Sequence, residues 1–204
     1  MEYKKQSSTS ITPRLIIHGG AGNILPSNLP PSKYKAYHDS LLRILAETHR
    51  FLTSPASTSP SSSKHASALD TVTYAVTQLE NNPLFNSGHG AVFTRDGINE
   101  LEASVMVSKG KKKRGVGLMG LQHVKNPIKL AREMLIRGEK DLEGGNGEHR
   151  GPMACDDNES SGAQGHSQLH KFSAEKLAKQ WGLEMVEPEY FFVQARWDGG
   201  SVTL

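Results

Sequence analysis

Residues 79–90 read LENNPLFNSGHG and connect a predicted helix to a predicted strand. Pro83 blocks continuation of the helix, and the apolar run 91–94 follows the glycines directly. Such a loop can turn several backbone carbonyls inward, and a ring of carbonyl oxygens suits a hard cation. Asn86 brings a side-chain amide, both donor and acceptor, to the mouth of the strand. The alternative is an ordinary connection in which Asn86 satisfies its own turn, and the residue pattern alone favours that alternative.

A second glycine-rich segment lies upstream. Residues 18–22 read HGGAG and follow the apolar run 15–17, which is predicted to form a buried strand. Glycines at a strand end let the backbone approach another group closely and expose N–H donors. Composition favours a structural turn, and the dinucleotide-binding pattern is excluded because the third glycine of that pattern and an immediate helix are missing.

Helices and strands are predicted from apolar periodicity and end signals. The apolar faces expected are those of Leu69, Val72, Ala75, Val76 and Leu79 in the helix from Ser67, and of Ile128, Ala131, Met134 and Leu135 in the helix from Asn126. Helices are expected over 32–52, from Ser67 towards Pro83 with Ser67 and Asp70 as a capping pair, from Asn126 to Gly138, and over 173–181. Asn126 can cap its helix, with Pro127 at the first position. Strands are expected over 91–94, 101–107 and 116–121, with a turn at 95–97 and a basic turn at 109–114.

This order of elements predicts one layered α/β or α+β domain. We expect a polar tail over 1–13, a domain over 14–204, and flexible loops at 53–65 and 139–166. Two carboxylates, Glu100 and Glu102, share one side of a predicted strand, and a solvated strand face is the favoured interpretation over an acid pair.

The composition excludes several classes of function. A net charge of +3 is too small to indicate nucleic-acid binding, and the basic cluster 111–114 is read as a hairpin turn. The nine histidines show no metal-binding spacing, and the single cysteine, Cys155, fits a reducing compartment. We see neither a secretory signal nor an apolar run near the length of about 20 residues that a membrane span needs. We therefore expect a cytoplasmic protein without nucleic-acid or membrane partners.

Taken together and in order, the motifs are far more specific than any one of them. They comprise LIIHGGAG at 15–22, LExxPLFNxGxG at 79–90, FTRDG at 93–97, ELEASVM at 100–106 and VKNPIKLAR at 124–132. Their order and spacing resemble the α chain of the N-terminal-nucleophile asparaginases, a family that includes plant-type asparaginases, isoaspartyl peptidases, glycosylasparaginases and threonine aspartases. Segments 162–166 and 184–197 look like later α-chain elements of fungal-type members.

The resemblance implies an αββα four-layer sandwich made as one precursor that cleaves itself before a threonine. The new N-terminal threonine of the β chain attacks the side-chain amide or isopeptide carbonyl of an asparagine derivative, with its own α-amine as base. Complete members commonly form dimers of αβ units. No cofactor is implied beyond a structural sodium ion.

Residue roles are carried over by the same resemblance. Asn86 would help to position the nucleophile, and Gly19 and Gly20 would lie near the cleavage site. The sodium ion would be held by the backbone carbonyls of Leu79, Glu80, Asn82, Phe85, Ser87 and His89.

The sequence departs from the family pattern at two places. Glu102 stands where Asp is usual, and Met106-Val107-Ser108 stands where Met-Asp-Gly is usual. The 204 residues end at Leu204, before any segment that could carry the threonine. We therefore expect an asparaginase-family amidohydrolase represented by its α portion and inactive alone. The alternative is a non-catalytic chain that acts by binding a partner chain.

Overall fold

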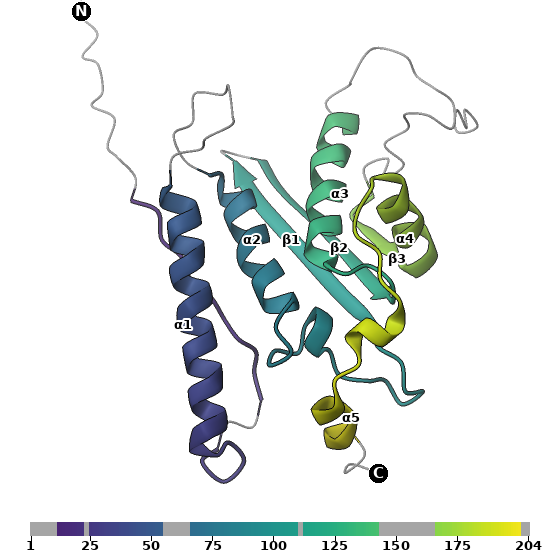
Figure 1. The fold of residues 1–204 in the computed structure, drawn as a ribbon. Coiled ribbons are helices and arrows are strands. Elements are labelled where there is room, and N and C mark those ends of the chain that lie inside the picture. The colour runs from purple at the N-terminus through teal and green to yellow at the C-terminus, as the bar shows by residue number, and fades with distance from the viewer. Residues whose placement is uncertain (1–11, 23–24, 55–65, 110–111, 143–165, 201–204) are drawn as a thin grey trace, which may run out of the picture.

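The computed structural model describes residues 12–22, 25–54, 66–109, 112–142 and 166–200 (Figure 1). In chain order the elements are helices α1 (Pro31–Thr53) and α2 (Ala68–Glu80), the 3₁₀ turn η1 (Gly88–Gly90), strands β1 (Leu101–Lys109) and β2 (Lys112–Leu121), helix α3 (Pro127–Leu142), strand β3 (Gln168–His170), helix α4 (Lys171–Gln180), the 3₁₀ turn η2 (Pro188–Phe191) and helix α5 (Gln194–Gly200). No helix in these ranges is long and apolar enough to cross a membrane.

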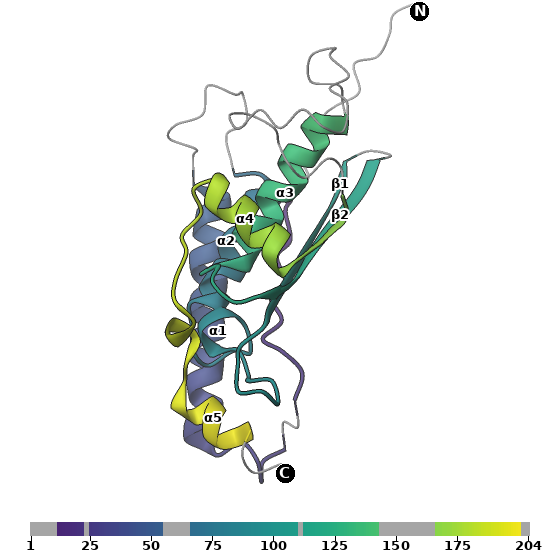
Figure 2. The same cartoon turned by 90° about the vertical axis from the view of Figure 1, so that its right-hand side faces the viewer.

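The sheet has the order β1-β2-β3, with β1 and β2 antiparallel and β2 and β3 parallel. Figure 2 shows α3 and α4 on one side of this sheet, and the other side uncovered by any described element. The alternation along β1 agrees, because Leu101 and Val105 are buried whereas Glu102, Ser104 and Met106 are exposed. The expected mixed α/β class is therefore confirmed, with one helical layer and one sheet layer described.

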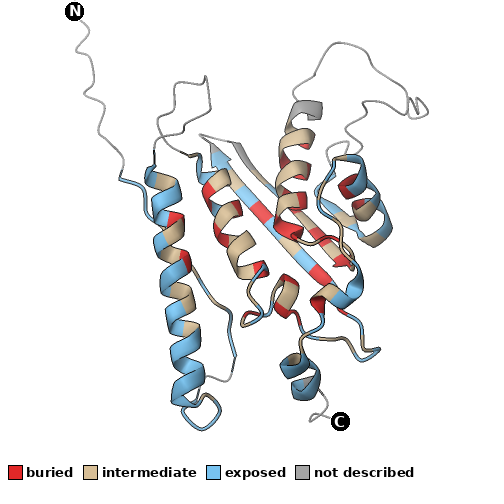
Figure 3. Ribbon diagram, viewed as in Figure 1, coloured by how far each residue is buried: buried red, intermediate tan, exposed pale blue. Residues whose placement is uncertain are grey.

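The core lies between the sheet and the helical layer (Figure 3). The predicted apolar face of α3 is confirmed: Ile128, Ala131, Met134 and Leu135 are each at most 2% exposed. They meet the inward side chains of the two long strands and Phe191 of η2. Helix α2 packs between α1 and α3, so the helices form a row that extends beyond the edge of the sheet.

Helix α2 begins at the predicted capping pair. Ser67 Oγ accepts the backbone N–H of Asp70 at 3.0 Å and donates to Asp70 Oδ2 at 2.7 Å. The predicted apolar face of this helix is partly wrong, because Val72 is 39% exposed while Thr71 and Thr73 are buried. The two threonines tolerate burial because each hydroxyl donates to a carbonyl one turn earlier, at 2.8 Å.

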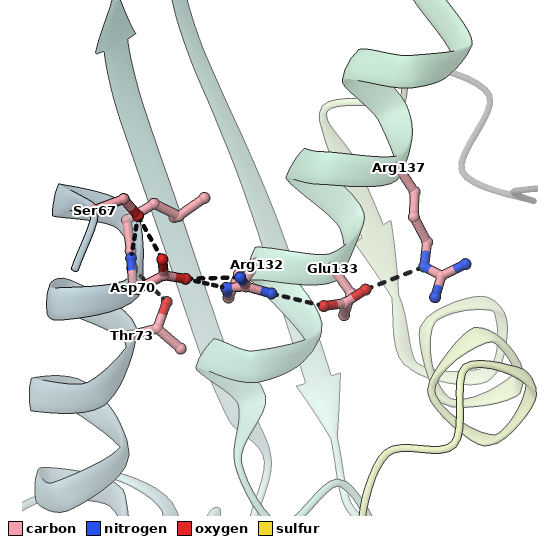
Figure 4. Close-up of polar contacts among 7 residues, drawn as sticks. Ser67, Asp70, Thr73, Arg132, Glu133 and Arg137 are labelled. Carbon is pink, nitrogen blue, oxygen red and sulfur yellow. Dashed lines mark hydrogen bonds and ion pairs between the residues drawn. The ribbon is translucent and has the colours of Figure 1, made fainter. Parts of the chain in front are cut away.

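A ladder of charged side chains joins α2 to α3 (Figure 4). Arg132 donates to Asp70 at 2.7 Å and to Glu133 at 2.9 Å, and Arg137 donates to Glu133 at 3.2 Å. Partial burial disfavours the charge on Asp70, but the hydrogen bonds from Ser67 and Arg132 outweigh it and lower the pKa of this carboxyl. The ladder ends where the Arg137 guanidinium lies 4.8 Å from the ring centroid of Trp181.

Two predicted strands are absent from the sheet. Residues 15–17 pair with no described strand, and Ile16 is 92% exposed, so the predicted buried strand is wrong. Residues 91–94 are also not a strand: the side-chain amide of Asn99 donates to the carbonyls of Ala91 and Val92, at 3.0 and 3.1 Å, in place of a ladder. The turn predicted at 95–97 is confirmed.

Helix α3 begins at Pro127, as predicted, but its capping group and its C-terminal end differ from the prediction. The acceptor found at its start is the Glu80 carboxylate, which takes the N–H of Ile128 at 2.9 Å, whereas the Asn126 side chain donates to Asn81. The helix also runs past Gly138 to Leu142. The loop predicted over 139–166 therefore begins later. Most of it, at 143–165, and most of the loop predicted at 53–65 lie outside the described residues.

Gly138 lies inside α3, where Arg114 packs against it. A Cβ added at Gly138 would overlap the Nη2 of Arg114 and lie 3.2 Å from its Cζ. The hairpin predicted at 109–114 is confirmed by the pairing of Lys109 with Lys112, but its turn is shorter than predicted because β2 already begins at Lys112. Arg114 therefore lies in β2, with its guanidinium against Gly138. Both terminal nitrogens of Arg114 are buried and find no hydrogen-bond partner among the described residues.

This packing predicts coupling between the two positions. Gly138→Ala is expected to stabilise an Arg114→Ala variant by about 1 kcal/mol through helix propensity. With Arg114 present the gain should shrink or become a loss, because the guanidinium must move. A double-mutant cycle by urea unfolding measures the difference, and additive effects would show that the two groups are not in contact.

Candidate functional site

The loop of residues 81–92 is built from overlapping turns between α2 and the segment before β1. The carbonyl of Leu79 accepts the N–H groups of Asn81 and Asn82. The carbonyls of Asn82, Phe85 and Ser87 each accept one backbone N–H, from residues 85, 87 and 90, at 2.8–3.2 Å. A carbonyl oxygen has two acceptor sites, so each of these single bonds leaves one site open. The turns therefore fix the loop without using up its acceptors.

Two glycines permit this close folding. A Cβ at Gly88, where φ is +53°, would come within 2.5 Å of the Glu80 carbonyl oxygen. A Cβ at Gly90 would overlap the Phe85 carbonyl oxygen and lie 2.7 Å from that of Pro83. The glycines are therefore required by contact with backbone oxygen atoms, which a side chain could not displace.

Asn86 lies at the exposed turn of this loop. Its Oδ1 accepts the backbone N–H of Val92 at 3.0 Å, which ties the two ends of the turn together. No partner for its Nδ2 group is found in the part of the chain that the structure describes. The amide oxygen thus closes the local turn, whereas the amide nitrogen can still donate hydrogen bonds on the solvent side.

The structure brings the upstream glycine turn to the same loop. A Cβ at Gly19 would lie 3.1 Å from the side chains of both Leu41 and Phe85. Phe85 is 3% exposed and stacks edge-on against Tyr37 of α1, with ring centroids 5.8 Å apart. Gly20 adopts φ +109° and donates its N–H to His18 Nδ1 at 3.2 Å. Segments about 65 residues apart in sequence thus meet at Phe85.

The most unusual group beside the loop is the carboxyl of Glu80, which is 1% exposed. Its Oε1 caps α3 through Ile128, and its Oε2 is buried and finds no hydrogen-bond partner in the described ranges. Burial raises the pKa of Glu80 to about 7, although the hydrogen bond from the Ile128 N–H, the nearby side-chain amide of Asn126 and the charge of Lys129 oppose the shift. This carboxyl, which lies directly before the loop, therefore titrates near neutral pH.

The C-terminal strap, residues 188–198, crosses this loop from the far end of the chain. His89 Nδ1 donates to the Tyr190 carbonyl at 2.5 Å, and Arg196 Nη2 donates to the Leu84 carbonyl at 2.6 Å. An aromatic cluster of Phe93, Phe192 and Trp197 continues the contact, with centroids 5.0–6.1 Å apart. The strap therefore holds the loop at several points.

Other groups considered from the sequence do not join this site. Glu102 is exposed on the open sheet face, and Glu100 lies just before β1, 4.0 Å from Lys171. Among the described residues, no three His, Cys, Asp or Glu side chains gather in a way that could hold a metal ion.

Sequence reasoning located the loop and the glycine turn but missed the side chains that support them. The roles of the Glu80 carboxyl and of Arg196 were not anticipated. Position 80 continues the spacing of Leu69, Thr73 and Val76 on α2, so a charged residue on the inner helix face was an available signal for Glu80. No local signal marks Arg196, because its partner is 112 positions away.

Comparison with known proteins gives a consistent result. The family model described as asparaginase matches residues 11–148. Isoaspartyl peptidases of Salmonella typhimurium and Escherichia coli are 32% and 31% identical over 184 residues, or 90% of this chain. A plant-type L-asparaginase of Thermococcus kodakarensis is 36% identical over 121 residues, 59% of this chain and 34% of that protein.

The match covers only part of each relative. It spans 47% of the Salmonella protein and 46% of the Escherichia coli protein, so the chain corresponds to less than half of either.

Proposed function

Because this chain belongs to the asparaginase family, we propose that it is the α portion of an amidohydrolase that cleaves L-asparagine or isoaspartyl peptides. The observation that carries the proposal is the loop of residues 81–92, which meets the glycine turn at Phe85. The relatives named above are isoaspartyl peptidases and an L-asparaginase. In this proposal a threonine at the start of a β segment is the nucleophile, freed by self-cleavage, and its α-amine acts as base.

Asn86 is the residue of this chain proposed to position that nucleophile. Its Nδ2 group is a donor without a partner among the described residues, while its Oδ1 is held by Val92. A side chain fixed at one end and free at the other can orient an incoming hydroxyl. Gly19 and Gly20 are proposed to lie near the cleavage site, since Gly19 lies against Phe85 of the same loop.

The loop also fits a structural sodium ion. The proposed donors are the carbonyls of Leu79, Glu80, Asn82, Phe85, Ser87 and His89. Three of these, the carbonyls of Asn82, Phe85 and Ser87, accept a single N–H in the structure, which leaves an acceptor site on each, and carbonyl oxygens are suitable ligands for a hard cation. The role of such an ion would be structural, because it would hold together the turns to which these carbonyls belong.

The uncovered face of the sheet is an argument that another segment packs against it. Strand β1 pairs only with β2 among the described residues, and its outward face carries Met106 at 66% exposure. Unpaired edges and open faces favour association with another segment. We propose that the β segment covers this face and completes the four-layer sandwich, in an αβ unit that pairs into a dimer.

The same observation favours a second candidate function, in which the chain is non-catalytic and acts by binding a partner chain. Both candidates need the open face. They differ in whether the partner brings a threonine nucleophile, and the sheet itself does not distinguish them.

Purification from the native source separates the two candidates. The intact mass is measured, and the same sample is assayed for aspartate release from L-asparagine and from an isoaspartyl dipeptide. We expect a co-purifying chain that begins with threonine, together with hydrolysis. A chain of 22.3 kDa without hydrolysis would reject the amidohydrolase and leave the binding candidate.

A further inference from the structure

We propose that Arg196 is a positioning residue, which holds Asn86 in place by binding the backbone of its loop. The inference deepens the proposed function, on which it rests for the role of Asn86, but its structural basis is separate. Arg196 donates to the Leu84 carbonyl at 2.6 Å, across 112 positions of sequence. A charge-assisted bond to a single carbonyl is among the stronger contacts a loop can have.

The strap holds the loop on both sides of Asn86. Arg196 binds two residues before it, at Leu84, and the Tyr190 carbonyl accepts from His89, three residues after it. Between these points Asn86 Oδ1 holds the N–H of Val92. Fixing both flanks restricts the backbone between them, so the direction of the Asn86 amide depends on the strap.

The strap is itself firmly anchored. Phe191 is fully buried in the main core, and Tyr190 packs against it edge-on with centroids 5.2 Å apart. Trp197, next to Arg196, packs on Phe93 at 5.0 Å and covers Gly97. The strap therefore links the core to the loop. Its contact with the part of the loop that precedes Asn86 in sequence is the bond from Arg196 to Leu84.

The Val92 amide gives a direct readout, because its hydrogen bond is made by Asn86 Oδ1. Hydrogen exchange is measured on the 204-residue chain as wild type, Arg196→Ala, Arg196→Lys and Arg95→Ala, an exposed arginine of the adjoining turn as control. We expect Arg196→Ala to speed exchange at Val92 by about tenfold, with α3 amides unchanged. Arg196→Lys should show a smaller increase, added methylguanidinium should partly reverse the alanine effect, and Arg95→Ala should match the wild type.

Two results would overturn the inference. One is unchanged Val92 exchange in Arg196→Ala. The other is an equal rise at Val92 and throughout α3, which would make Arg196 a residue of general stability only. In the protein completed by its threonine-bearing segment, Arg196→Ala should lower kcat about tenfold with little change in KM. Absence of hydrolysis in the wild type would refute the proposed function and leave the exchange result as the test of positioning.

Discussion

Gly90→Ala is expected to destabilise the chain by on the order of 3 kcal/mol or more, a large effect for one methyl group. The added Cβ would overlap the carbonyl oxygen of Phe85 and crowd that of Pro83. Both are backbone atoms within consecutive turns, and the Phe85 oxygen accepts the N–H of Ser87, so the backbone cannot move aside without disturbing these turns. Urea unfolding followed by circular dichroism measures the change.

Gly117→Ala is the matched control. A Cβ at Gly117 would meet no atom within 4 Å, and the residue lies in β2 on the open sheet face. Its effect on the free energy of unfolding should stay within about 0.5 kcal/mol. Equal losses for the two variants would mean that the loop does not fold as closely as the carbonyl contacts indicate.

Glu80→Gln is expected to alter how stability depends on pH. The pKa of Glu80 is about 7 in the folded chain, against 4.5 for the unfolded group, so between these values the folded state binds more protons. The contribution of Glu80 to the free energy of unfolding should therefore be highest below pH 4.5 and should fall as pH rises towards 7. The difference is roughly 3 kcal/mol. Gln keeps an oxygen for the Ile128 N–H but cannot ionise.

Unfolding in urea from pH 4.5 to 8 tests this expectation. The gap in unfolding free energy between Glu80→Gln and wild type should move in favour of the variant as pH rises, and level off above about pH 7. Glu102→Gln, at an exposed carboxyl of β1, should run parallel to wild type. Parallel curves for wild type and Glu80→Gln would show that the buried carboxyl is ionised without penalty.

Local signals predicted much of the fold. The apolar spacing of α3, the Ser67 cap and the proline that blocks α2 act within a few residues, and each is seen in the structure. The predicted strands at 15–17 and 91–94 failed because a strand needs a partner. Ile16 has none among the described residues, and Asn99 takes the carbonyls of Ala91 and Val92 instead.

The candidate site shows the same division. The glycines and Asn86 mark the loop in the sequence, because backbone conformation restricts residue type locally. The sequence by itself therefore determined the family, the mixed α/β class and the position of the loop. Only the tertiary structure decided that Glu80 caps α3, that Arg114 occupies the space a side chain at position 138 would need, and that Arg196 binds the Leu84 carbonyl. These contacts join residues 24 to 112 positions apart, and burial and hydrogen bonding between such residues depend on how whole elements pack.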